Sequence, residues 1–164
     1  MGEYKAIKKK VTETSAKEGC ELTKESKKLG KEAEEIDAII QELQNKVRDI
    51  FDQKVVDELK QEYRTDFNNE QEKIENQFES VKDDLKNNQA DIADEGNKVT
   101  DAINEINKMQ NISDVGKKSA NKAKDEMEKS LKDYNDMEKT IDDIISQQGS
   151  EMQDSSRKIQ SKFR

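Results

Sequence analysis

Apolar residues recur at heptad spacing over a stretch of more than forty residues in the middle of the chain. The series comprises Phe67, Ile74, Phe78, Val81, Leu85, Ile92, Val99, Ala102, Ile106 and Met109. Successive members lie three, four or seven residues apart, so they share one stripe of an α-helix. Asn88 and Glu95 occupy two positions of the same stripe, and polar seam residues set the register of a helix pair while weakening it. The pattern predicts a long helix that packs on other helices.

A second heptad run precedes this stripe, with steps of four, three, four and three. Its members are Ile36, Ile40, Leu43, Val47 and Ile50. The phase of the run does not continue into the later stripe, because fourteen residues beyond Ile50 the chain reaches Arg64 and not Phe67. The mismatch falls within residues 51–57.

Two structures account for the mismatch within residues 51–57. One is a tight turn between antiparallel helices, with Asp52 or Asp57 as the N-cap of the second helix. The other is local over- or underwinding of one continuous helix. The turn is the favoured prediction, because a continuous helix from Ile36 to Met109 would be about 110 Å long.

The clearest break in the pattern lies at residues 110–116, where Asn, Ser, Asp and Gly cluster. Ser113 or Asp114 can cap the helix that follows. That helix carries apolar residues at heptad spacing, among them Ala120, Met127, Tyr134 and Ile141.

Before residue 31 the apolar residues are sparse, and Gly19 and Gly30 interrupt them. So thin a stripe supports only a marginal helix. The predicted fold class is all-α, an elongated antiparallel helical hairpin or coiled coil with two or three long helices in one domain. Its parts are a weakly ordered basic N-terminal helix at 1–30, heptad helices at 31–50 and 58–110, a C-terminal helix at 117–155 and a basic tail at 156–164.

The composition agrees with long helices. Charged residues make up 41% of the chain, hydrophobic residues 30%, and proline, which would interrupt helices, is absent. Disorder is the competing interpretation of such a composition. It is rejected for most of the chain because a disordered segment does not keep an apolar phase for forty residues.

The net charge of −8 is unevenly distributed. Residues 1–32 carry +3 and the residues after Asp154 carry +4, which leaves −15 for the part between them. An acidic body argues against nucleic acid as a partner, because binding phosphates needs a basic surface.

The residue types that catalysis and metal binding use most are scarce. The chain contains no histidine, and its single cysteine, Cys20, excludes both an internal disulfide and a cysteine-based zinc site. The sequence therefore predicts a protein without enzymatic activity, cofactor or metal. No apolar run is long enough for a transmembrane segment or resembles a cleaved leader, so a cytoplasmic location is expected, with export by a leaderless route left open.

The stretch Leu43–Phe78 carries a family resemblance. One apolar helix ends near Val47-Arg48-Asp49-Ile50-Phe51, a short break follows, and the next helix presents Val55, Val56, Leu59, Tyr63 and Phe67. This arrangement resembles the helical-hairpin proteins of bacterial type VII secretion, the WXG100 (ESAT-6-like) proteins and the helical targeting partners of LXG toxins. Phe51-Asp52-Gln53 stands where those families carry Trp-x-Gly. The resemblance implies an adaptor that binds the helical N-terminal domain of an effector and presents it for export.

The same resemblance implies an export signal of the form Tyr-x-x-x-Asp/Glu, which Tyr134 and Glu138 fit. These residues lie four apart and share a helix face, so a receptor could bind both. Core packing is the alternative role for Tyr134, because it occupies a heptad position.

The expected partner is a helical protein, either an LXG effector, a WXG100-like protein or a second copy of the chain. The alternative function is a cytosolic coiled-coil tether or a SNARE-like bundle component. The predicted partner interface comprises both heptad runs: Ile36, Ile40, Leu43, Val47, Ile50, Phe67, Ile74, Phe78, Val81, Leu85, Ile92, Val99 and Ile106.

Overall fold

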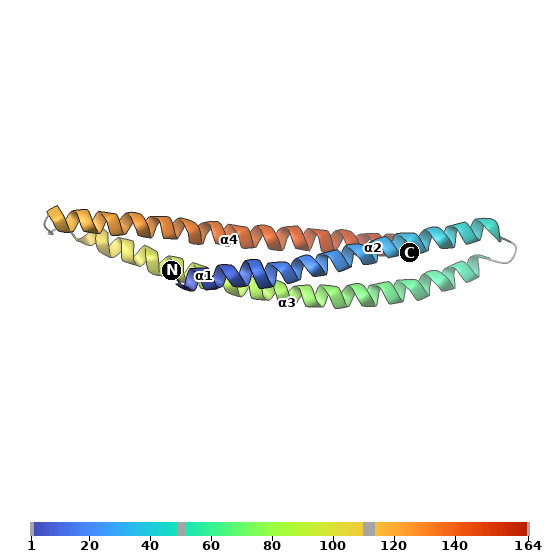
Figure 1. Ribbon diagram of the computed structural model, residues 1–164. Helices are drawn as coiled ribbons and strands as arrows, with labels where there is room; N and C mark the ends of the chain where they lie inside the picture. Colours follow the sequence, from blue (N-terminus) through green and yellow to red (C-terminus); the bar gives the residue numbers. More distant parts are fainter. Residues whose placement is uncertain (1, 49–51, 110–113, 164) are drawn as a thin grey trace. The chain divides into compact units, whose positions relative to one another are not determined.

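The computed structural model describes residues 2–48, 52–109 and 114–163 (Figure 1). These residues form α1 (Gly2–Lys9), a π-helical segment η1 (Lys10–Ser15), α2 (Ala16–Lys46), α3 (Gln53–Lys108) and α4 (Asp114–Lys162). The three ranges contain no strand. The all-α prediction is confirmed.

The chain divides into two compact units. The first unit comprises residues 1–16 and 83–145, and the second comprises residues 17–82 and 146–164. The sequence predicted one domain, because 164 residues is a length typical of a single domain.

In the second unit α2 lies antiparallel to α3. Gln44 Nε2 donates a hydrogen bond to Gln53 Oε1 (3.2 Å), and Ser26 Oγ donates one to Gln71 Oε1 (3.0 Å). Ser26 lies eighteen residues before Gln44 in α2, and its partner Gln71 lies eighteen residues after Gln53 in α3. The two helices therefore run in opposite directions. The last part of α4 is parallel to α2, since Lys27 pairs with Glu151 and, seven residues on in both helices, Glu34 pairs with Lys158.

The three helices of the second unit share apolar clusters and one polar layer. One cluster joins Ala33 of α2, Phe67 of α3, and Ile159 and Phe163 at the end of α4. The polar layer is centred on Gln71, which accepts the Ser26 hydrogen bond and whose Nε2 also donates to the Met152 carbonyl (3.4 Å). This one side chain therefore links α2, α3 and α4.

In the first unit α3 and α4 are antiparallel. Gln89 Nε2 donates to the Glu138 carbonyl (3.0 Å), and Gly96, seven residues later, lies against Leu131, seven residues earlier. The core residues of this unit are Val11, Leu85, Ile92, Tyr134, Met137 and Ile141, all of them buried.

A break separates α2 from α3, so one continuous helix is wrong here, but the break lies before Gln53 and not across the predicted residues 51–57. Helix α2 ends at Lys46 and α3 begins at Gln53. The backbone N–H of Val55 donates to Asp52 Oδ1 (3.1 Å), which makes Asp52 the N-cap, whereas Asp57 lies inside α3. Because this cap is used, α3 begins five residues before the expected residue 58. Residues 49–51, including Ile50, lie outside the described ranges.

The helix of the N-terminal region does not stop at its glycines. Helix α2 runs through Gly19 and Gly30, so the predicted boundary at residue 30 is wrong. Both glycines are buried where α4 approaches: a Cβ at Gly19 would collide with the Gln148 amide, and one at Gly30 would lie 3.7 Å from Ser155 Cα. Close approach of two helices, and not a turn, is what these glycines provide.

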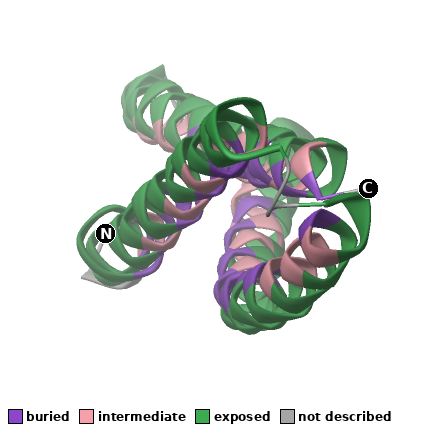
Figure 2. Cartoon of the chain, turned by 90° about the vertical axis from the view of Figure 1, so that its right-hand side faces the viewer, coloured by how far each residue is buried: buried purple, intermediate pink, exposed green. Residues whose placement is uncertain are grey.

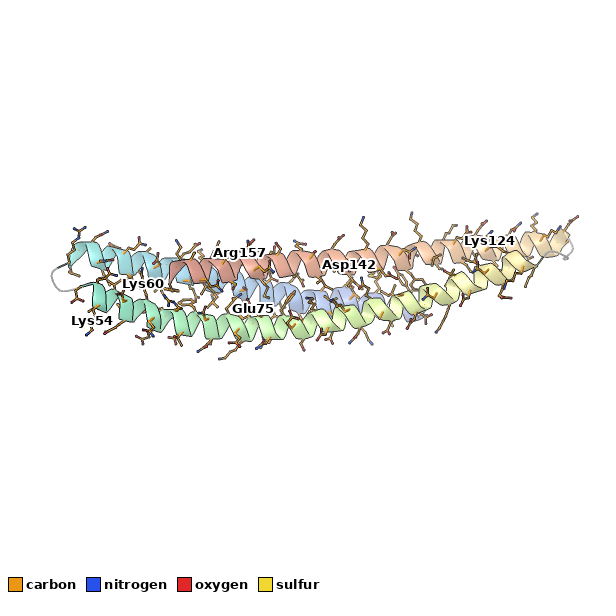
Figure 3. The ribbon with its side chains drawn as sticks, turned by 180° about the vertical axis from the view of Figure 1, so that it is seen from behind. Lys54, Lys60, Glu75, Lys124, Asp142 and Arg157 are labelled. Atoms are coloured by element: carbon orange, nitrogen blue, oxygen red, sulfur yellow. The ribbon has the colours of Figure 1, made fainter. Side chains whose placement is uncertain are left out.

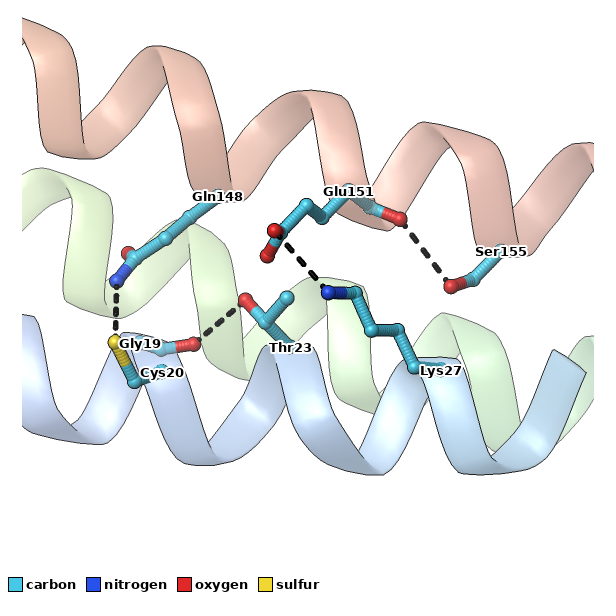
Figure 4. Close-up of polar contacts among 7 residues, drawn as sticks. All are labelled: Gly19, Cys20, Thr23, Lys27, Gln148, Glu151 and Ser155. Atoms are coloured by element: carbon cyan, nitrogen blue, oxygen red, sulfur yellow. Dashed lines mark hydrogen bonds and ion pairs between the residues drawn. The ribbon is translucent and has the colours of Figure 1, made fainter. Parts of the chain in front are cut away.

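Figure 4 shows the contacts of this region between α2 and α4. Thr23 Oγ1 donates to the Gly19 carbonyl (2.8 Å), and Gln148 Nε2 donates to the exposed Cys20 thiol (3.5 Å). Lys27 Nζ lies 3.1 Å from Glu151 Oε1.

The second break separates α3, which ends at Lys108, from α4, which begins at Asp114. Residues 110–113, including the candidate cap Ser113, lie outside the described ranges. Helix α4 continues to Lys162, so residues 156–162 of the predicted basic tail are helical. They are held by Ile159 and Phe163, both fully buried, which the short apolar pattern of this segment did not reveal.

Burial follows stripes along the helices (Figure 2). Most charged side chains lie on the other faces, where Lys54 and Arg157 project outward (Figure 3), whereas Asp37 is buried. This division is the one expected for helices that pack on each other and face water elsewhere.

Candidate functional site

Most of the predicted partner interface on α3 packs within the chain itself. Phe67, Ile74, Phe78, Val81, Leu85 and Ile92 are buried, and Val99 and Ile106 are half-buried. A heptad pattern does not say whether the helix that completes it belongs to the same chain or to another. In this structure α3 is covered by the chain's own helices, so a partner cannot reach its buried seam.

The predicted interface residues of α2 divide into two groups. Ile40 is buried and Ile36 is half-buried against the Ala33–Phe163 cluster. Leu43 and Val47, in contrast, keep 43% and 38% of their surface exposed. Ile50 lies outside the described residues.

Sequence reasoning missed one residue of this exposed surface. Ile39 is 55% exposed and precedes Leu43 by four residues, as Leu43 precedes Val47. Val47 directly follows α2, and its backbone N–H still donates to the Leu43 carbonyl (3.0 Å) as in a helix. The spacing of four therefore places all three side chains on one side. We call Ile39, Leu43 and Val47 the α2 stripe; its signal was present in the sequence, but the heptad assigned to α2 took Ile40 in place of Ile39.

The α2 stripe begins where the third helix of the second unit ends. The Phe163 ring packs against Tyr63 (centroids 6.2 Å apart) and Phe67 (5.3 Å), and Arg64 Nε donates to the Phe163 carbonyl. Helices α2 and α3 continue past this point as a pair, which we call the α2–α3 hairpin end (residues 36–48 and 52–62). The pair keeps its own seam there, because Ile40 and Val56 are buried.

Apolar side chains of α3 also continue past the contact with Phe163. Tyr63, Leu59 and Val55 lie four residues apart and are all half-buried. Tyr63 contacts the end of α4, and the next two positions of its stripe lie past that end. Two apolar stripes, one on each helix, therefore extend beyond the helix that covers their first members.

A charged cleft between α2 and α4 is a second candidate site. It measures about 800 Å³ and is lined by Lys27, Lys31, Glu34, Glu151, Asp154, Ser155, Arg157 and Lys158. Its acids and bases pair with each other, as in Lys27–Glu151 at 3.1 Å and Lys158–Glu34 at 3.7 Å. Paired exposed charges of both signs are typical of a solvated surface, and they contribute little stability.

The two residues of the possible export signal differ in access. Tyr134 is 6% exposed, and its ring meets the Tyr4 ring edge-on with centroids 5.1 Å apart. Glu138 is half-buried, and its carbonyl accepts the hydrogen bond from Gln89. In this conformation Tyr134 packs in the core, so a receptor does not reach its ring.

The packing of Tyr4 also changes the pKa of its hydroxyl. Burial raises the pKa of its hydroxyl above the ordinary value of 10.0, and the negative charges of Asp133 and Asp136 raise that pKa further. Its hydroxyl also donates a long hydrogen bond to the Asp133 carbonyl (3.4 Å). Tyr4 thus ties α1 to α4.

The described residues offer neither a metal site nor a membrane-spanning helix. Over residues 2–48, 52–109 and 114–163, no group of three or more His, Cys, Asp or Glu residues is placed to hold a metal ion. Among the described helices, none combines the length and apolarity needed to cross a membrane. Comparison with protein families, curated proteins and solved structures finds no match to this chain.

Proposed function

We propose that the chain is a non-enzymatic helical adaptor of bacterial type VII secretion, which binds the helical N-terminal domain of an effector and presents it for export. The α2 stripe is the observation that carries the proposal. Single exposed apolar residues are ordinary, but three in steps of four on one helix are typical of surfaces that bind another helix.

The rest of the described surface supports binding at this place. Among the described residues, the other large apolar side chains with high exposure are Met109 and Val115, each next to a helix end. The charged cleft has no histidine and no free thiol in its lining. An adaptor role is therefore better supported than catalysis.

The SNARE-like and tether alternatives need helices whose seams are free to join other chains. The seam of α3 is buried from Phe67 to Ile92 by helices of the same chain. No observation in the structure favours these alternatives over the adaptor.

The test is co-purification with a client, the helical N-terminal domain of an effector encoded beside the gene for this chain. We expect the client to co-purify with the unmodified chain and to be lost with Ile39→Gln/Leu43→Gln. Val115→Gln is the matched control, because Val115 is 78% exposed and lies in the first unit.

The outcome separates the alternatives. A client that binds both variants equally, or does not bind the unmodified chain, would contradict the proposed function. Circular dichroism of both variants should match that of the unmodified chain, because exposed substitutions change stability by no more than about 0.5 kcal/mol.

A further inference from the structure

We infer that the α2–α3 hairpin end binds a basic amphipathic helix of a partner protein, which lies as a third helix in line with α4. The inference deepens the proposed function and rests on it, because it assigns the chemistry of the client segment that the adaptor recognises.

Continuity with an existing interface is the first argument. Where α4 is present, its Ile159 and Phe163 fill the space between α2 and α3 and contact Ala33 and Phe67. Ile36 and Tyr63 are the last residues of the two stripes that pack on this cluster. One to three turns further, the stripes continue as Ile39, Leu43 and Val47 on α2 and as Leu59 and Val55 on α3. The same two helices thus present the same kind of surface that already accepts a helix.

The hairpin end is held in position before any partner binds. Ile40 and Val56 bury the contact between the two helices, and Gln44 Nε2 donates to Gln53 Oε1 close to the turn. Asp52 caps the first turn of α3 through the Val55 N–H. A partner helix therefore meets two positioned helices and does not need to order them, which favours binding.

The negative charge of the hairpin end favours a basic occupant. Residues 36–62 contain seven Asp and Glu against four Lys and Arg, a net charge of −3. The helix that packs next to this segment within the chain ends in basic residues, with Arg157, Lys158, Lys162 and Arg164 and no acid after Asp154. An occupant in line with α4 meets the same acidic helices, so lysine and arginine beside its apolar residues are favoured.

The length of the surface sets the length of the occupant. From Ile36 to Val47 the α2 residues span eleven steps, which is about 17 Å of helix and corresponds to an occupant of about 11–15 residues. Its apolar residues are expected at spacings of three and four, so that they form one stripe.

The probe is a synthetic peptide of about fifteen residues with leucine at i, i+4, i+7 and i+11 and lysine or alanine elsewhere. A second peptide carries glutamate in place of every lysine. Binding of the labelled peptides to the full chain is measured by fluorescence anisotropy at physiological ionic strength, where non-specific attraction between exposed charges is screened.

We expect the lysine peptide to bind more tightly than the glutamate peptide. Ile39→Gln and Leu43→Gln should each weaken it by at least about tenfold, because each loses a side chain that the complex buries. Both substitutions conserve charge, so a loss of affinity reports the apolar contact. Val115→Gln, the matched control, should leave the affinity unchanged.

Three results would overturn the inference. Equal binding of the two peptides would exclude a basic occupant. Equal weakening by Val115→Gln would show that the peptide does not choose the hairpin end. A chain that is a dimer alone and becomes a monomer on Leu43→Gln would make a second copy the occupant.

Failure of the inference and failure of the proposed function give different results. If neither peptide binds but the client still depends on Leu43, the basic helix is wrong and the adaptor stands. If the lysine peptide binds as expected but no client does, the binding surface stands and the export function is wrong.

Discussion

At the residue scale, Leu85 shows that the heptad stripe of α3 forms part of the core. It has no exposed surface, whereas the adjacent Lys86 is exposed. Leu85→Ala should lower the free energy of unfolding by about 2–5 kcal/mol, through lost burial and the cavity left behind. Lys86→Ala, one position off the stripe, should change it by no more than about 0.5 kcal/mol. Urea unfolding of the two variants measures both values, and equal losses would mean that Leu85 is not in the core.

Substitutions at Tyr134 and Glu138 distinguish a packing role from an export role. Tyr134→Phe keeps the ring that packs on Tyr4 and should cost much less stability than Tyr134→Ala, which should cost about 3–5 kcal/mol. Glu138→Gln should leave folding intact, because the backbone carbonyl of Glu138, which accepts the hydrogen bond from Gln89, is kept. An export assay on Glu138→Gln then decides the secretion role: unchanged export would leave this pair with a packing role alone.

The raised pKa of Tyr4 predicts how stability depends on pH. The folded chain holds the Tyr4 proton above pH 10.0, the value at which the unfolded chain releases it. Stability from this group is therefore complete below about pH 10 and is lost as the pH rises further. Tyr4→Phe should remove this part of the alkaline loss, so we expect the two chains to diverge in urea unfolding only above about pH 10. A constant difference from pH 8 to pH 11 would contradict it.

At the scale of elements, α2 shows why sequence reasoning failed before residue 31. Its buried face consists of two rows in steps of seven: Gly19, Ser26, Ala33 and Ile40, and Thr23, Gly30, Asp37 and Gln44, of which Gln44 is half-buried. Each heptad position of these two rows is at least half-buried, but most of the positions carry small or polar side chains. A search for apolar residues does not detect such a face, because its packing depends on the close approach of α4 and on hydrogen bonds such as Ser26–Gln71.

The glycines of the helices give an element-scale prediction. Gly149 lies inside α4, and a Cβ placed on it would meet nothing within 4 Å. Gly149→Ala should raise the free energy of unfolding by about 0.5–1 kcal/mol, through the higher helix propensity of alanine. At Gly19, in contrast, the new Cβ would displace the buried Gln148 amide, so Gly19→Ala should gain less or lose stability. Thermal unfolding of the pair tests the difference, and a larger gain at Gly19 would show that α4 does not approach α2 there.

For the whole molecule, the sequence predicted the parts that depend on apolar periodicity and capping. The all-α class, the α3 stripe and the Asp52 cap follow from these signals. The two units, the helical C-terminal residues and the exposure of Ile39 do not, because each depends on where other helices end and not on the local pattern. The exposed α2 stripe lies past the contact between Tyr63 and Phe163, and the local pattern of α2 does not show where that contact falls.

The concentration dependence of thermal unfolding tests most directly the claim that the chain completes its own helix seam. The unmodified chain is heated at protein concentrations that differ by about a hundredfold, with helix content followed by circular dichroism. A seam that is completed within one chain predicts a Tm that does not change with concentration. A Tm that rises with concentration would mean that a second copy completes the seam, and would contradict the account.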